Sequence, residues 1–153
     1  MKEFKVAPIR NGTVIDHITA GQALNVLKIL GINENNIDST ISVALHVPSG
    51  KDMRLKDIVK LEDRELDSAA VDQIALIAPD ATIGIIRDYF GAEKFKVSLA
   101  DEITGLARCS NPNCITNKGE PVEPQFRVID RHPPTLRCSY CDRTLVNISD
   151  NLL

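Results

Sequence analysis

The first hundred residues alternate between the two-residue period of a strand and the longer period of a helix. Strand-like runs cover residues 4–10, 14–18, 40–47, 57–62, 81–87 and 95–97; the run over 4–10 alternates only weakly, whereas the one over 40–47 is β-branched and clearly alternating. One helix is predicted after Thr19, with apolar residues recurring until Gly31, and a second after Asp67 or Ser68, ending at Pro79. This order predicts an α+β fold, a βαββαβ ferredoxin-like sandwich with both helices on one face of an antiparallel sheet.

After residue 100 the pattern changes to short strands between turns. Strands are predicted over 125–129 and 144–148, and Pro121 and Pro124 interrupt the stretch before them. We therefore expect a first domain over 1–97, a hinge over 98–107 and a small all-β, zinc-ribbon-like domain over 108–153. About 50 residues rarely bury enough apolar surface to fold without a metal, disulfide or partner.

All four cysteines lie in this second part. Four residues separate Cys109 from Cys114, two separate Cys138 from Cys141, and twenty-three separate the pairs. Each pair can direct two thiolates at one ion, so the spacing predicts a closed tetrahedral zinc site. Such a site is structural, because no position is left for water. Two disulfides or free core thiols are the alternatives. Backbone N–H groups of the loops within each pair are expected to donate hydrogen bonds to the sulfurs.

Charge and composition limit the possible functions. The net charge is −3 and is spread evenly, with 12 basic and 14 acidic residues in 1–100 and 6 and 7 in 101–153. A zinc-ribbon nucleic-acid binder would need a surplus of positive charge, so we favour protein contact over nucleic acid. No apolar run approaches 18 residues and no signal-peptide core follows the N-terminus, so we expect no membrane span and a cytoplasmic protein whose thiols stay reduced.

A second group of polar residues could bind a small ligand. Asp16 and His17 come from one strand, Lys56 and Lys60 from another and Lys94 from near a third. Ammonium groups suit phosphates and a carboxylate suits ribose hydroxyls, so the group is compatible with a nucleotide. Solvated surface lysines and a structural histidine are the alternative. No glycine-rich phosphate loop and no nucleophile–base set occurs, which argues against an enzyme, although a small-molecule-sensing enzyme stays a rival hypothesis.

The chain resembles the regulatory chain of aspartate carbamoyltransferase along essentially its whole length. The resemblance is carried by four stretches, in chain order: Asn11-Gly12-Thr13-Val14-Ile15-Asp16-His17-Ile18, Pro48-Ser49-Gly50 leading into Lys56-Asp57-Ile58-Val59-Lys60, Val71-Asp72-Gln73-Ile74 through Ala78-Pro79, and Cys109-Ser110-Asn111-Pro112-Asn113-Cys114-Ile115. It departs from the family pattern at Ala7-Pro8, at Gly84 and in the length of the loop Lys51–Leu55.

The resemblance implies a non-catalytic subunit that adjusts pyrimidine biosynthesis. Its first domain would bind the effectors CTP, UTP and ATP, and its zinc domain would contact the catalytic chain. Regulatory chains would form homodimers within a dodecamer of six catalytic and six regulatory chains. In the family pattern Asp16 would bind the ribose and Lys60 would contact the ribose or the base. Lys94 and His17 would face the phosphates, with Lys56 near them. Backbone near Ile9 and Tyr89 would contact the base, and Val6 and Val14 would line the pocket.

Overall fold

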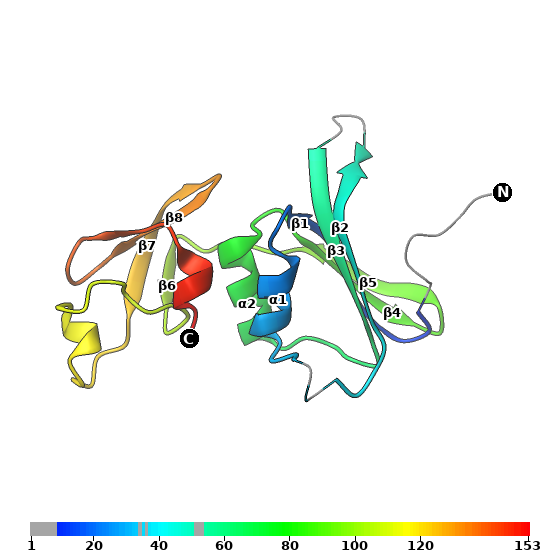
Figure 1. The fold of residues 1–153 in the computed structure, drawn as a ribbon, viewed down its shortest axis with the longest axis horizontal. Coiled ribbons are helices and arrows are strands. Elements are labelled where there is room, and N and C mark those ends of the chain that lie inside the picture. Colours follow the sequence, from blue (N-terminus) through cyan, green and yellow to red (C-terminus); the bar gives the residue numbers. More distant parts are fainter. Residues whose placement is uncertain (1–8, 34, 36, 51–53) are drawn as a thin grey trace. The chain divides into compact units, whose positions relative to one another are not determined.

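The computed structural model describes residues 9–33, 35, 37–50 and 54–153 (Figure 1). The chain divides into two compact units, Met1–Val97 and Ser98–Leu153. Among the described residues, no helix combines the length and apolar character needed to cross a membrane.

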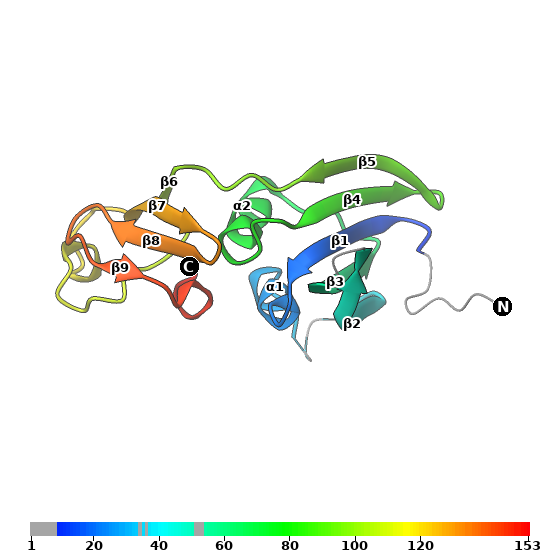
Figure 2. The same ribbon diagram turned by 90° about the horizontal axis from the view of Figure 1, so that it is seen from above.

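The first unit is a five-stranded antiparallel sheet with two helices. Its elements are β1 (Gly12–Thr19), α1 (Ala23–Ile29), β2 (Ile41–Ser49), β3 (Arg54–Glu62), α2 (Ser68–Ile77), β4 (Thr82–Arg87) and β5 (Phe90–Lys96). The strands lie in the order β2-β3-β1-β4-β5 (Figure 2), and the helices lie on one face (Figure 1). The connectivity confirms the predicted βαββαβ arrangement, with β5 added at one edge.

Alternation along the strands builds the core of this unit. Ile15, Val59 and Ile83 stand on neighbouring strands in one cross-strand row, and each is at most 1% exposed. Their side chains share the face that the helices cover, since successive residues of a strand point to opposite faces. Val26 of α1 and Ile74 of α2 are also fully buried. Residues such as Lys56 and Lys60, which alternate with this buried row, lie on the other face of the sheet.

Element boundaries differ from the sequence prediction where backbone chemistry intervenes. Residues 4–8 of the first expected strand lie outside the described residues. The helix expected directly after Thr19 begins at Ala23, because Gly21 adopts a left-handed φ of 91° that a helix cannot contain. The strand expected to stop at residue 47 continues through Pro48, which an edge strand such as β2 tolerates. Asp67 does cap α2, with Oδ1 accepting the Ala70 N–H at 2.8 Å.

The second unit is a small four-stranded antiparallel sheet in the order β6-β7-β8-β9. Its elements are β6 (Glu102–Thr104), the 3-10 turn η2 (Ile115–Asn117), β7 (Gln125–Arg131), β8 (Pro134–Cys138), β9 (Thr144–Leu145) and η3 (Ile148–Asn151). The strand over 125–129 is confirmed, whereas the one over 144–148 is only two residues long and then turns into η3. β6 lies inside the segment 98–107, so that segment contains part of the second sheet.

Candidate functional site

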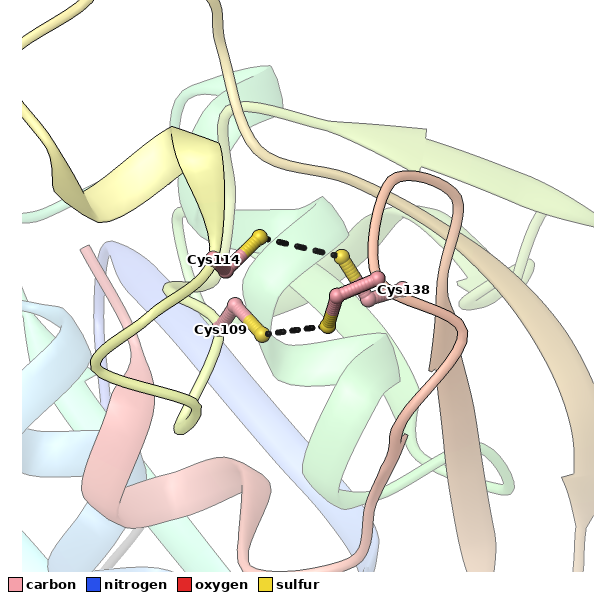
Figure 3. Close-up of side chains that lie close together, drawn as sticks. Cys109, Cys114 and Cys138 are labelled. Carbon is pink, nitrogen blue, oxygen red and sulfur yellow. Dashed lines mark hydrogen bonds between the residues drawn. The ribbon is translucent and has the colours of Figure 1, made fainter.

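Two loops of the second unit bring the four cysteines together. Cys109 and Cys114 flank the loop before η2, Cys138 ends β8, and Cys141 lies in the turn toward β9. All four Sγ atoms lie within 4.8 Å of one another, with Cys109–Cys141 at 3.6 Å and Cys114–Cys138 at 3.7 Å. Figure 3 shows Cys109 and Cys114 on one loop with Cys138 facing them. None of the four is in a disulfide.

The sulfur arrangement fits a single zinc ion. Zn–S bonds of about 2.3 Å at tetrahedral angles place neighbouring sulfurs about 3.8 Å apart, close to the separations of the two pairs. Four thiolates fill the coordination sphere, so the ion would hold the loops in place and would have no position for a reacting water. The cluster is therefore a structural metal site, as the cysteine spacing predicts.

Tight turns fix the direction of each thiol. In the first loop the Cys114 N–H donates to the Asn111 carbonyl at 3.0 Å. In the second loop the Cys138 N–H donates to the Arg143 carbonyl at 2.9 Å, and the Asp142 N–H donates to the Cys138 carbonyl at 3.0 Å. The Asn111 N–H bonds to the Cys109 sulfur and the Tyr140 N–H to the Cys138 sulfur. The loops thus donate N–H groups to the sulfurs, as expected from the sequence.

Burial and hydrogen bonding shift the pKa values of three of the thiols in different directions. Burial raises the pKa of the Cys109 thiol to about 12, and it also raises the pKa of Cys138. At Cys141 burial acts in the same direction, but the Arg143 N–H and the Asn111 side chain stabilise the thiolate and lower the pKa to about 7. Four ionised sulfurs at this spacing repel one another, so a bound cation is what makes the tetrathiolate stable at neutral pH.

Two side chains that support the cluster have no counterpart in the sequence prediction. Thr116 donates its hydroxyl to the Cys114 sulfur at 3.2 Å. Asn117 donates its side-chain amide to the carbonyls of Cys109 and Asn111, both at 2.8 Å, which closes the first loop. Both residues belong to η2, and a three-residue 3-10 turn has no periodicity that a sequence pattern could reveal.

The polar face of the first sheet carries the second candidate site. The register places Lys60 of β3 opposite Val14 of β1, Val14 opposite Gly84 of β4, and Gly84 opposite Lys94 of β5. Directly opposed residues share a face, and this row alternates with the buried row at Ile15. The fold therefore brings Lys60 and Lys94, which are distant in sequence, onto the face away from the helices. Val14 and Gly84 lie between them.

Asp16 lies one position further along the same face and contacts Lys56 and His17. Its Oδ1 is 2.8 Å from the Lys56 Nζ and accepts the His17 N–H at 2.6 Å. His17 Nδ1 also contacts the Thr82 hydroxyl at 3.3 Å. Burial acts to raise the pKa of Asp16, but the hydrogen bonds from Lys56 and from the His17 N–H outweigh it and hold that pKa below its usual 3.8. Asp16 is thus a fixed carboxylate at neutral pH.

The residues expected near a base lie toward the other end of β1. The Tyr89 N–H donates to the Arg10 carbonyl at 2.8 Å, which brings the turn after β4 against the segment that contains buried Ile9. Tyr89 is 65% exposed. Val6 lies outside the described residues. The structure thus places eight of the nine candidate positions on this unit, and whether they bind one ligand stays a prediction.

The comparisons with known proteins cover both units. A family model described as the aspartate carbamoyltransferase regulatory chain, allosteric domain, matches residues 4–98, and one described as the metal binding domain of the same chain matches residues 101–149.

Three relatives, each named aspartate carbamoyltransferase regulatory chain, match over nearly their full length. The one from Methanothrix thermoacetophila is 56% identical over 99% of this chain and 98% of its own. The one from Thermoplasma volcanium is 53% identical over 94% and 93%, and the one from Thermococcus gammatolerans is 54% identical over 95% and 94%.

Proposed function

Because this chain belongs to the family of aspartate carbamoyltransferase regulatory chains, we propose that it is a non-catalytic subunit that carries effector signals to a catalytic chain. Its first unit binds the nucleotides CTP, UTP and ATP on the polar face of the sheet. Its second unit, held in shape by zinc, docks on the catalytic chain. It acts in the cytoplasm, where cysteine thiols stay reduced and available to the metal.

The row Lys60–Val14–Gly84–Lys94 is the observation that carries the nucleotide site. Two ammonium groups stand on either side of a strip formed by Val14 and Gly84. At Gly84 the strand has no side chain, so a flat ligand can approach the backbone. Lys94 and His17 contact the phosphates with Lys56 nearby, while Asp16 contacts the ribose and Lys60 the ribose or the base.

The base is read near Ile9 and Tyr89, with Val14 lining the pocket. Backbone N–H and C=O groups distinguish base edges by their hydrogen-bond pattern. The turn at Tyr89, an exposed residue, is held against Arg10, the residue after Ile9, by the hydrogen bond from the Tyr89 N–H. Phosphates and ribose are common to all three effectors, so their contacts give affinity but do not decide whether the effector activates or inhibits. The base therefore sets the sign of the response, because an effector acts only by binding one state of the assembly more tightly than another.

The second unit has the surface of a protein-docking module. Its metal site is closed and its charge is nearly balanced. Ile115, directly after Cys114, and Tyr140, between Cys138 and Cys141, are each 47% exposed. Apolar side chains displayed on loops that a metal makes rigid suit a protein partner better than a phosphate backbone. The segment 98–107 carries movement of the first unit to this surface.

The proposed assembly is a dodecamer of six catalytic and six regulatory chains with regulatory homodimers. β2 is one edge of the first sheet, and its Val43 and Leu45 are exposed. An edge strand with exposed apolar side chains offers both backbone hydrogen bonds and apolar area to a second copy. We propose β2 as the homodimer edge.

Reconstitution with the catalytic chain tests the proposal. A zinc-dependent complex should form, and CTP and ATP should shift its carbamoyl-transfer curve. Lys60→Ala and Lys94→Ala should weaken nucleotide binding but leave the complex intact, whereas the control Lys28→Ala, on α1, should change neither. An unshifted curve would exclude the regulatory role, and unchanged affinity in both site variants would exclude this site. Turnover by the chain alone, or salt-dependent binding to DNA or RNA, would favour a rival function.

A further inference from the structure

Two β-bulges flank β3 at neighbouring residues. On β1 the register shifts between Ile15, opposite Val59, and Ile18, opposite Asp57. On β2 it shifts between Ala44, opposite Ile58, and Val47, opposite Lys56. Between these paired positions, β1 and β2 each contain one more residue than the segment of β3 that they face.

Each bulge contains a histidine in the left-handed region. His17 has φ 56° and His46 has φ 54°. A side chain with a Cβ adopts this conformation at a cost of about 1–3 kcal/mol, so the surrounding contacts must hold it there. The question for each bulge is which side chain supplies those contacts.

Asp57 supplies them at His46. Its carboxylate is fully buried, with Oδ1 accepting the His46 N–H at 3.0 Å. Its Oδ2 accepts the N–H groups of Gly21 at 2.9 Å and Ala23 at 3.1 Å. Gln22, at the N-cap of α1, makes no side-chain cap, so the cap comes from β3 instead. Three donors compensate for burying the carboxylate and join β2, β3 and the start of α1.

Lys56, the preceding residue of β3, supplies the contacts at His17. Its ammonium group holds Asp16 at 2.8 Å, and Asp16 accepts the His17 N–H. Lys56 and Asp57 therefore secure one bulge each, on opposite faces of the same strand. A displacement of β3 at either residue moves the other, because one peptide bond joins them.

We propose that Asp57 is a positioning residue for the nucleotide site, acting through Lys56 and the two bulges. The role rests on the proposed function, since it concerns the geometry of Asp16, His17 and Lys56 as ligand contacts. Asp57 fixes β3 against β2 and α1, which keeps Lys56 within reach of Asp16. It also connects the site to the edge strand β2.

Asp57→Asn and a matched control test the role in the full chain. An amide at 57 presents N–H₂ to at least one backbone N–H and loses that hydrogen bond. We expect faster hydrogen exchange at the His17 amide without nucleotide, and about tenfold weaker CTP binding by calorimetry. The control is Asp67→Asn, which replaces another helix-capping carboxylate, the one that accepts the Ala70 N–H at the start of α2. It should change neither readout.

The outcomes separate this inference from the proposed function. If wild-type chain failed to bind CTP, the proposed function would fall, and with it the role in nucleotide binding. Unchanged exchange at His17 in Asp57→Asn would overturn the positioning role whether or not CTP binds. Unchanged CTP affinity would overturn it equally.

A second variant covers the case in which Asp57→Asn does not fold. Lys56→Met removes the ammonium group that holds Asp16 and should speed hydrogen exchange at the His46 amide, on the far side of β3. Lys96→Met is the control, since it removes another lysine–carboxylate pair, with Asp80 at 3.4 Å. Exchange at His46 that does not respond to Lys56→Met overturns the coupling of the two bulges.

Discussion

The Lys56 Nζ lies 2.8 Å from the Asp16 Oδ1, across the β1 bulge, and the pair is partly shielded from solvent, with the Lys56 side chain 17% exposed. The same carboxylate accepts the His17 N–H. One ion pair therefore sets the ionisation of Asp16 and the conformation of the left-handed residue beside it.

The pH dependence of stability should report this pair. The folded-state pKa of Asp16 lies below the usual 3.8, so the stabilisation is complete above that pH and is lost as the pH falls through the lowered pKa. Lys56→Met should raise the pKa of Asp16, because burial then acts without its main opposing contact. Carboxyl carbon shifts in an NMR titration measure it. A pKa of Asp16 that stays low in Lys56→Met would show that the ion pair is not its cause.

His46→Gly should stabilise the first unit. Glycine adopts a left-handed φ without Cβ strain, and the backbone N–H that Asp57 accepts is retained. After the extra entropy of glycine in the unfolded chain, the free energy of unfolding should rise by about 0.5–1 kcal/mol. Denaturant unfolding measures the change. His46→Ala loses the same imidazole but keeps Cβ, so the prediction is wrong if the two variants are equally stable.

Asn117→Ala should weaken zinc binding although residue 117 is not a ligand. Its amide joins the carbonyls of Cys109 and Asn111, and without it the first cysteine pair is less well oriented before the metal arrives. Losses of about 10–100-fold are typical for outer contacts of a metal site. Competition with a chromogenic chelator measures the affinity. Asn113→Ala is the control, because its backbone N–H, which bonds to Asn111, survives the substitution.

The sequence predicts what depends on periodicity and spacing. Cysteine spacing indicates the metal site, and the order of strand and helix patterns indicates an antiparallel sheet with both helices on one face. The bulges at His17 and His46 are not visible, because one extra residue in a strand leaves no compositional trace.

Asp57 could have been recognised from its position. It occupies the inward phase of β3 with Val59 and Leu61, so the alternation itself places a carboxylate among core residues. A charge at such a position must find donors nearby. The donors themselves, the N–H groups of Gly21, Ala23 and His46, come from segments whose approach only the fold determines.

Zinc removal should separate the two kinds of chain in the assembly, and not only unfold the second unit. Without the ion the buried Cys109 thiol, with its pKa raised to about 12, takes up a proton at neutral pH, and the two loops lose their common ligand. The Ile115 and Tyr140 surface is then no longer fixed, whereas the first unit keeps its own core around Ile15 and Val59. Chelator treatment of the reconstituted assembly should release catalytic chains that still transfer carbamoyl groups but no longer respond to CTP. Sedimentation with activity assays measures both effects, and chelator already saturated with zinc is the control. A complex that stays intact and regulated after complete zinc removal would contradict the docking role of the metal-bound loops.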